Sequence, residues 1–165
     1  MIDADGYRAN VGIILANDQN QLFLGRRVGQ DAWQFPQGGI NSDESPLEAM
    51  YRELEEEVGL KPEQVKLLGE TQEWLRYRLP KKYIRRYSHP LCIGQKQRWF
   101  LLRIICNESD FCLNRSNKPE FDNWKWVNYW APVTEVIYFK KEVYQCALEQ
   151  LGRKIFPKGL PDQKK

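Results

Sequence analysis

Histidine is nearly absent from this sequence: His89 is the only one among 165 residues. A serine–histidine or cysteine–histidine catalytic pair would therefore have to use this residue, which is followed directly by Pro90. Zinc sites that need several histidines are equally hard to assemble. Hard cations that prefer oxygen ligands, such as Mg²⁺, remain compatible with the composition.

Paired cysteines and long apolar runs are absent as well. The four cysteines show no C-x-x-C spacing, which favours reduced, mostly buried thiols over disulfides or a zinc site. No apolar run approaches the roughly 20 residues that span a bilayer, and the first ten residues lack the basic and apolar segments of a secretion signal. We therefore expect a cytoplasmic protein with no membrane partner.

What the chain does contain is typical of one folded domain. Apolar residues make up 42% of the sequence and aromatic residues 13%, enough for a single hydrophobic core at this length. Periodicity predicts an α/β domain over residues 1–156 and a loose polar tail over residues 157–165. Strands are expected at residues 11–15, 22–26, 65–71, 98–106 and 124–130, a short aromatic segment at 33–36, and helices at 46–58 and 140–156.

Acidic residues are concentrated in one segment, GGINSDESPLEAMYRELEEEVGL at residues 38–60, although the formal net charge of the chain is +3. Ser45 and Glu48 form a capping-box pattern around Pro46, and Gly59 suits a left-handed C-terminal cap, so a helix is expected between them. At 100° per residue its apolar side chains fall on one face, which is expected to meet the core. These are Leu47, Met50, Tyr51, Leu54 and Val58.

Three glutamates of this helix, Glu53, Glu56 and Glu57, lie at i, i+3 and i+4 and share another flank. A solvated charged face, with Arg52 relieving some repulsion, is one explanation. A bound cation is the other. It is favoured because the acids crowd the C-terminal half of the helix, where the helix dipole disfavours negative charge, and because a Gly-Gly loop precedes the helix.

The spacing within this segment resembles the Nudix box at every defined position: Gly38, five residues, Glu44, seven residues, then RELEEEVGL. The resemblance to Nudix hydrolases implies a mixed β-sheet sandwiched between helices, with the box at residues 38–60 as a loop-helix-loop. It also implies cleavage of a nucleoside diphosphate linked to another group, with a divalent metal.

The same resemblance implies a role for each residue of the box. Glu53, Glu56 and Glu57 would bind Mg²⁺ or Mn²⁺, as more than one ion, for attack of water on phosphorus. Which group takes the proton of that water stays open. Glu120, in KPEFDNW, would add a ligand or a base, although an ordinary loop acid is the alternative. The carbonyl group of Gly38 would add a further ligand, and the box would be supported by Gly39, Glu44, Arg52 and Gly59.

Substrate choice must come from outside the box. Residues 74–87, WLRYRLPKKYIRRY, contain six basic side chains and no acid, with aromatic residues interleaved. Basic groups pair with phosphates and aromatic rings stack on unpaired bases. The alternative is a solvated basic loop whose aromatic side chains belong to the core.

Further segments, among them WQFPQGGI, CIGQKQRWFLL and PEFDNWKWVNYW, resemble bacterial Nudix hydrolases that act on RNA. This implies conversion of 5′-triphosphate or 5′-diphosphate RNA ends to 5′-monophosphate ends, which promotes mRNA decay. Candidates to hold phosphates or the first bases are Arg8, Arg27, Tyr77 and Lys140. Two alternatives stay open: hydrolysis of dinucleoside polyphosphates by the same chemistry, and a non-catalytic RNA-binding module, against which the intact glutamates argue.

Overall fold

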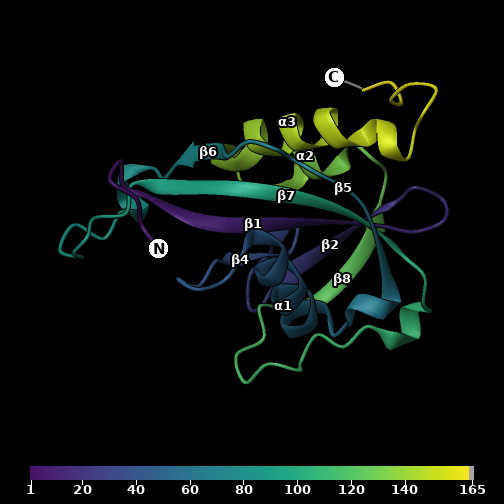
Figure 1. Ribbon diagram of the computed structural model, residues 1–165, viewed down its shortest axis with the longest axis horizontal. Helices are drawn as coiled ribbons and strands as arrows, with labels where there is room; N and C mark the ends of the chain where they lie inside the picture. The colour runs from purple at the N-terminus through teal and green to yellow at the C-terminus, as the bar shows by residue number, and fades with distance from the viewer. Residues whose placement is uncertain (164–165) are drawn as a thin grey trace.

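The computed structural model describes residues 1–163, which form a mixed eight-stranded sheet with helices on both faces (Figure 1). The strands are β1 (Tyr7–Ala16), β2 (Leu22–Arg27), β3 (Trp33–Gln34), β4 (Gln37–Gly39), β5 (Val65–Glu70), β6 (Leu75–Arg78), β7 (Gly94–Ile104) and β8 (Phe121–Val127). The helices are α1 (Pro46–Val58), α2 (Ala131–Glu135) and α3 (Lys141–Leu151), with five short 3₁₀ turns between elements.

The sheet is organised around the long parallel pair of β1 and β7, which matches Tyr7 with Gly94 and continues to Ala16 opposite Arg103. Its main order is β3-β2-β1-β7-β5; in addition β4 pairs with β1, β6 with β7 and β8 with β2. Helix α1 covers one face, and α2 and α3 cover the other (Figure 1). The expected α/β sandwich is confirmed.

Alternation along β1 divides the core between these two faces. Val11, Ile13 and Leu15 pack on the side of α1, whereas Ile14 and Ala16 pack on the side of α3. All five side chains are fully buried. Because both faces of β1 are covered, this strand reads as a continuous apolar run, as is usual for a strand that is buried on both sides.

Several predicted elements are confirmed. Helix α1 spans the predicted residues 46–58, with a capping box between Ser45 and Glu48 and a left-handed Gly59 at its C-cap (φ 79°). The strands expected at 11–15 and 22–26 correspond to β1 and β2, which pair antiparallel with Ala16 opposite Leu22. The strands expected at 65–71 and 98–106 correspond to β5 and β7.

Other boundaries were wrong. Strand β8 starts at Phe121 and ends at Val127, not at 124 and 130, because pairing with β2 extends it backward to Phe121. Helix α3 ends at Leu151 rather than 156, where the chain tightens into a 3₁₀ turn over Gly152–Lys154. The short strands β4 and β6 were missed, since both are defined by pairing with distant strands rather than by local pattern.

The core face of α1 is also rotated from the predicted one. Leu47 is 40% exposed and Tyr51 is only half-buried, whereas Ala49, Glu53 and Glu57 are buried beside the predicted apolar residues. The reason is that β4 lies over the flank that carries the glutamates. Two carboxyl groups are thereby held in the interior.

Residues 157–163 are held in place more firmly than expected. The indole Nε1 of Trp130 donates to the carbonyl of Pro161 at 2.7 Å, and the side-chain amides of Gln145 and Gln163 form a reciprocal pair. Leu160 packs against the cluster that contains α3. The expectation of a loose tail is therefore wrong for residues 157–163, and residues 164–165 lie outside the described part.

Two further expectations concern the state of the cysteines and the presence of a membrane-spanning segment. All four cysteines are free, as predicted, but each is only partly buried. In residues 1–163, no helix combines the length and the apolar character needed to cross a lipid bilayer.

Candidate active site

The loop before α1 approaches the helix so closely that only glycine fits at position 38. A Cβ atom on Gly38 would lie 2.0 Å from Cδ of Glu53. Gly38 belongs to β4, which pairs with β1 through Val11. The sheet thus presses the backbone at Gly38 onto the Glu53 carboxylate.

Arg52 joins the loop to the helix through its guanidinium group. Its Nε donates to Oε2 of Glu44 at 2.6 Å, and its Nη2 donates to Oε1 of Glu44 and to the carbonyl of Gly39. Nη1 reaches Glu53 at 2.8 Å and Glu56 at 3.4 Å. Glu48 and Glu55 lie four and three residues from Arg52 on the same helix, but neither pairs with it. The structure thus brings together three of the four residues predicted to support the box.

Glu57 is the most deeply buried acid in this region, with 7% of its surface exposed. Burial raises its pKa well above the ordinary value, and the negative charges of Glu53 and Glu120 raise it further. Burial also raises the pKa of Glu53, although the hydrogen bond from Arg52 opposes this shift. The site therefore concentrates negative charge without enough positive charge to balance it.

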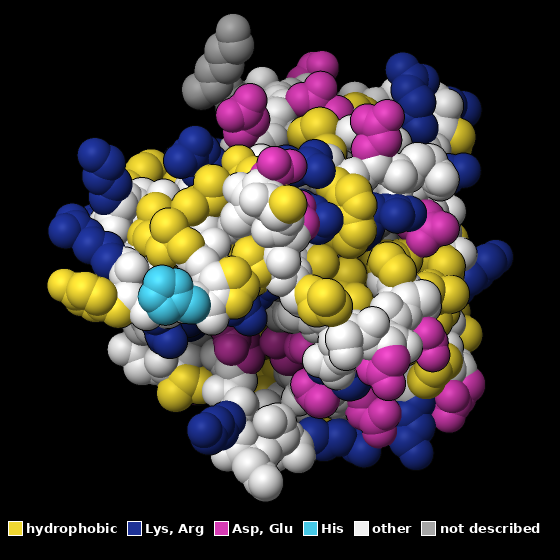
Figure 2. Space-filling view, turned by 60° about the vertical axis from the view of Figure 1, so that its left-hand side comes forward, with side chains coloured by type: hydrophobic (Ala, Val, Ile, Leu, Met, Phe, Trp, Pro, Cys, Tyr) yellow, Lys and Arg dark blue, Asp and Glu magenta, His cyan; other side chains and the backbone are white. Residues whose placement is uncertain are grey.

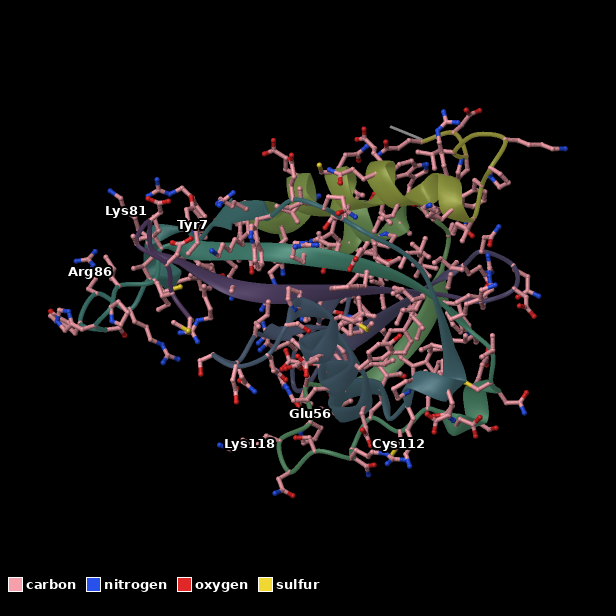
Figure 3. All side chains as sticks on the ribbon, in the orientation of Figure 1. Tyr7, Glu56, Lys81, Arg86, Cys112 and Lys118 are labelled. Atoms are coloured by element: carbon pink, nitrogen blue, oxygen red, sulfur yellow. The ribbon has the colours of Figure 1, made fainter. Side chains whose placement is uncertain are left out.

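These acids surround a pocket of about 280 Å³, which we call the acidic pocket (Figure 2, where acidic side chains are recessed in a hollow). Its lining consists of Gln37, Gly38, Glu53, Glu56, Glu57, Ser116, Lys118 and Glu120. Figure 3 shows Glu56 on α1 and Lys118 on the loop that precedes β8. All four predicted catalytic glutamates and Gly38 are thus brought to one cavity.

The acidic pocket fits a divalent cation by the chemistry of its donors. Oε2 of Glu57 is buried and has no hydrogen-bond partner within residues 1–163, which is costly unless another group supplies positive charge. The donors are carboxylate and carbonyl oxygens, the ligands that Mg²⁺ prefers. In the described residues, however, no three metal-ligating side chains converge into a preassembled cluster; Glu56 is instead turned toward Arg52.

A second cavity, of about 320 Å³, adjoins the acidic pocket. We call it the aromatic pocket, because Trp33, Tyr83 and Phe139 contribute rings to it. Three predicted substrate-binding residues also line it: Arg27, Tyr77 and Lys140. The full lining is Arg27, Gln30, Ala32, Trp33, Gln34, Gln37, Tyr77, Leu79, Tyr83, Gln95, Glu120, Val136, Ile137, Phe139 and Lys140.

Lys140 is unusual because its ammonium group is buried, with 7% of the residue exposed. Burial, together with the nearby charge of Arg27, lowers the pKa of Lys140 to about 8. Nζ donates a long hydrogen bond of 3.4 Å to Oε1 of Gln37 and lies 5.8 Å from the centre of the Tyr77 ring. No carboxylate is paired with it among residues 1–163, which leaves the ammonium group able to pair with an anion.

Gln37 and Glu120 line both cavities and therefore form the boundary between them. Oε1 of Glu120 forms an ion pair with Nε of Arg27 at a distance of 3.5 Å. Gln37 was missed as a functional candidate, although its position directly before Gly38 was a signal for it. Ser116, Lys118 and Phe139 were missed as well, because only the folded chain brings their segments to the site.

Arg8, the fourth predicted substrate-binding residue, lies in a neighbouring groove of about 500 Å³. We call this the basic groove. It shares Leu79, Tyr83 and Gln95 with the aromatic pocket. The two cavities are therefore adjacent, although Arg8 itself does not line the acidic pocket.

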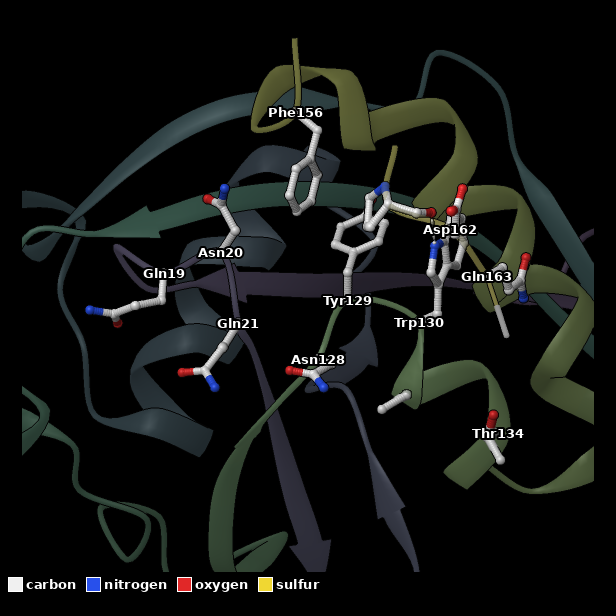
Figure 4. Close-up of a pocket in the computed structure, with 12 residues that line it drawn as sticks. Gln19, Asn20, Gln21, Asn128, Tyr129, Trp130, Thr134, Phe156, Asp162 and Gln163 are labelled. Atoms are coloured by element: carbon white, nitrogen blue, oxygen red, sulfur yellow. Dashed lines mark hydrogen bonds between the residues drawn. The ribbon is translucent and has the colours of Figure 1, made fainter. Parts of the chain in front are cut away.

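A further pocket, of about 450 Å³, contains none of the predicted site residues (Figure 4). Its lining is mostly neutral amide and aromatic side chains from residues 19–21 and 128–131 and from the end of the chain, and Asp162 is the only charged residue among those described. It lacks the convergent cations and acids that distinguish the other cavities. The predicted site residues lie instead in the acidic pocket, the aromatic pocket and the basic groove.

Comparison with known proteins agrees with this geometry. The sequence profile of the NUDIX domain matches residues 6–146. The chain belongs to the Nudix family. It is 58% identical over all 165 residues to an RNA pyrophosphohydrolase of Thioalkalivibrio sulfidiphilus, of which it covers 95%. It is 62% identical over 151 residues, 92% of this chain, to an RNA pyrophosphohydrolase of a Marinomonas species, of which it covers 94%.

Solved structures show the same fold in more distant Nudix proteins. The E. coli dihydroneopterin triphosphate pyrophosphohydrolase is similar with a TM-score of 0.67 and 18% identity, over 85% of this chain and 95% of that one. A Nudix hydrolase from Listeria monocytogenes reaches a TM-score of 0.64 with 20% identity, over 92% and 95%. The chain is thus a Nudix hydrolase, an enzyme that acts on pyrophosphate bonds, and enzymes of this family depend on divalent metal.

Proposed function

We propose that this Nudix hydrolase is an RNA pyrophosphohydrolase that converts 5′-triphosphate or 5′-diphosphate RNA ends to 5′-monophosphate ends. The observation that carries the proposal is the shared boundary of the two cavities. At Gln37 and Glu120, an acidic pocket suited to metal meets a pocket lined with cations and aromatic rings. The named activity of relatives that are 58–62% identical over nearly their whole length supports it.

In this proposal Glu53, Glu56 and Glu57, with Glu120 and the carbonyl of Gly38, hold Mg²⁺ or Mn²⁺, as more than one ion. A bound divalent cation supplies charge that neutralises phosphate oxygens and makes a coordinated water more acidic. The protein's own contribution is to hold the carboxylates in place. Arg52 holds Glu53 through a hydrogen bond of 2.8 Å, and β4 packs closely against the Glu53 carboxylate at Gly38.

The aromatic pocket would receive the phosphates and the first bases. Arg27 and Lys140 carry positive charge at the edge nearest Glu120, where they can pair with phosphate oxygens. Tyr83 and Phe139, whose ring centres are 5.5 Å apart, offer aromatic faces for a nucleobase. Tyr77 is 6% exposed and therefore mainly shapes the wall.

The product of this reaction is an RNA with a 5′-monophosphate end. Such an end exposes a transcript to nucleases that prefer it, so the enzyme would promote mRNA decay in the cytoplasm. Dinucleoside polyphosphates are the second candidate substrate, because one nucleoside could occupy the aromatic pocket while the phosphate chain crosses Glu120. The chemistry of the acidic pocket is the same in both cases.

The deciding experiment compares kcat/KM on a 5′-triphosphorylated oligonucleotide and on a diadenosine polyphosphate, with and without Mg²⁺. We expect Mg²⁺-dependent release of phosphate or pyrophosphate and a preference for RNA. A large preference for the diadenosine polyphosphate would make dinucleoside polyphosphates, rather than RNA, the first candidate substrate. Absence of release from either substrate by the wild type would instead favour the non-catalytic RNA-binding alternative. Glu53→Gln serves as the inactive control, and turnover that survives this change would contradict the metal role of Glu53.

A further inference from the structure

A strongly basic surface extends beyond the residues that the reaction needs. From Trp74 to Asn107 the sequence contains no Asp or Glu. Among residues 1–163, no carboxylate lies within ion-pair distance of the six cations of residues 74–87. These are Arg76, Arg78, Lys81, Lys82, Arg85 and Arg86. Positive charge without acidic partners indicates a polyanionic ligand.

The connection between β6 and β7, residues 79–93, presents part of this charge on a well-defined loop. Its base is closed by a hydrogen bond of 2.8 Å from the backbone N–H of Leu79 to the carbonyl of Ile93. Near its tip, the backbone N–H of Ser88 donates to the carbonyl of Arg85 at 3.1 Å, which places Arg86 and Tyr87 at the centre of a turn. We call residues 79–93 the basic loop.

Tyr87 is the most exposed aromatic side chain of the described chain, with 94% of its surface accessible. The other aromatic residues of the basic segment contact neighbouring side chains or line the aromatic pocket. Lys96 and Arg98 lie over the ring of Trp74, and Tyr83 packs against Phe139. An aromatic ring that gains nothing from the core, placed beside two arginines, is suited to stacking on an unpaired base.

The basic loop adjoins the proposed site of the reaction. Arg85 and Ser88 line the basic groove together with Arg8, and this groove shares Leu79 and Tyr83 with the aromatic pocket. Figure 3 shows Lys81 and Arg86 projecting from the end of the molecule beyond Tyr7. In Figure 2, where His89 is the only cyan side chain, basic and apolar side chains surround it beside the acidic hollow.

We propose that the basic loop binds the single-stranded body of the RNA downstream of the nucleotides held in the aromatic pocket. Arg85 and Arg86 pair with backbone phosphates, and Tyr87 stacks on a base. The inference rests on the proposed function, since it takes the 5′ end to lie at the acidic pocket. It explains how an active site of small volume can favour RNA over a dinucleotide: the longer substrate gains contacts that the shorter one cannot reach.

The test compares a 5′-triphosphorylated dinucleotide with a 5′-triphosphorylated 12-nucleotide RNA. For Arg85→Ala/Arg86→Ala, we expect the ratio of kcat/KM for the long substrate to that for the short one to fall by about tenfold, in line with the loss of about 1.4 kcal/mol. The dependence of long-substrate kcat/KM on salt should weaken by about 1.4 in the log–log slope, because each phosphate of a single strand contributes about 0.7. Tyr87→Ala should lower the same ratio without changing the slope.

Arg153→Ala/Lys158→Ala is the matched control. It also removes two exposed cations, but from the segment after α3, at the opposite end of the molecule (Figure 1). We expect it to leave the ratio at its wild-type value. A fall of the same size in this control would overturn the proposal, because it would show a general effect of net charge. So would an unchanged ratio in the Arg85→Ala/Arg86→Ala variant.

A second readout separates this proposal from the proposed function. Binding of a 12-nucleotide 5′-monophosphate RNA, followed by fluorescence anisotropy, reports on the loop without any hydrolysis. Weaker binding by the loop variant supports the proposal even if no RNA end is hydrolysed. Unchanged RNA binding, together with lost binding to phosphatidylglycerol vesicles, would overturn it and assign the loop to a lipid surface.

Discussion

Arg52 binds both carboxylate oxygens of Glu44, with Nε–Oε2 at 2.6 Å and Nη2–Oε1 at 2.9 Å. The two residues are eight positions apart, on the helix and on the loop that precedes it. Their bidentate pair lowers the pKa of the Glu44 carboxyl group. It joins the loop that carries Gly39 to the helix that carries Glu53, so the geometry of the acidic pocket depends on it.

Replacing Arg52 by Lys keeps the charge but removes the planar fork that binds Glu44, Glu53 and Gly39 together. We expect the free energy of unfolding to fall by about 1 to 3 kcal/mol, with weaker Mg²⁺ binding because Glu53 is no longer held. Urea denaturation and the Mg²⁺ dependence of Tm measure the two effects. Arg115→Lys is the control, since Arg115 meets Glu55 only in an exposed pair at 3.7 Å. Equal losses in both variants would contradict the assignment.

Glu57→Gln should separate activity from stability. The neutral amide removes a buried charge that Glu53 and Glu120 repel, so Tm in the presence of a chelator should rise by a few degrees. Activity should fall by about 100-fold or more, because the proposal makes Glu57 a ligand for the metal. Addition of Mg²⁺ should raise Tm of the wild type and have a smaller effect on the variant.

Glu55→Gln is the matched control for this experiment, since Glu55 lies on the same helix but away from the acidic pocket. It should retain the activity and the Mg²⁺ response of the wild type. If Glu57→Gln unfolded at a lower temperature than the wild type in chelator, the explanation from charge repulsion would be wrong.

Stability should depend on pH through Lys140. Its pKa is lowered to about 8 in the folded protein, against about 10.4 for an unfolded lysine. Between these values the unfolded chain binds more protons, so the contribution of Lys140 to stability rises with pH across this window. Lys140→Met should abolish that part of the rise, as measured by urea denaturation at pH 7.5 and 9.5. Lys141→Met, at an exposed position next in the chain, should preserve it.

Removal of residues 157–165 should destabilise the enzyme. The loss includes the hydrogen bond from Trp130 to Pro161 and the packing of Leu160, which together contribute about 1 to 3 kcal/mol. Thermal denaturation measures the loss. Trp130→Phe should reproduce part of this loss of stability, since phenylalanine keeps an aromatic ring but lacks the indole N–H that donates to Pro161. Neither change touches the acidic or the aromatic pocket, so kcat should be retained; a large fall in kcat would show an influence of the tail on the site.

Much of the acidic half of the site could be predicted from the sequence, because its signals are local. The caps at Ser45 and Gly59 act within one helical turn, so they define the helix wherever it packs. The spacing of Glu53, Glu56 and Glu57 depends only on the period of that helix. The charge imbalance of residues 74–87 was likewise visible in the chain itself.

Only the tertiary structure decided which face of this helix is buried and which segments line the aromatic pocket. Helical periodicity alone gave no reason to bury Glu53 and Glu57. The strand that covers them, β4, is held in place by its pairing with β1, and β1 is far from the helix in sequence. The aromatic pocket joins segments around residues 27, 37, 77, 120 and 140, and no local pattern relates them. The spacing of side chains along one helix or strand is set by the local backbone. Which side chains face one another across a cavity is set by the packing of the whole sheet and its helices.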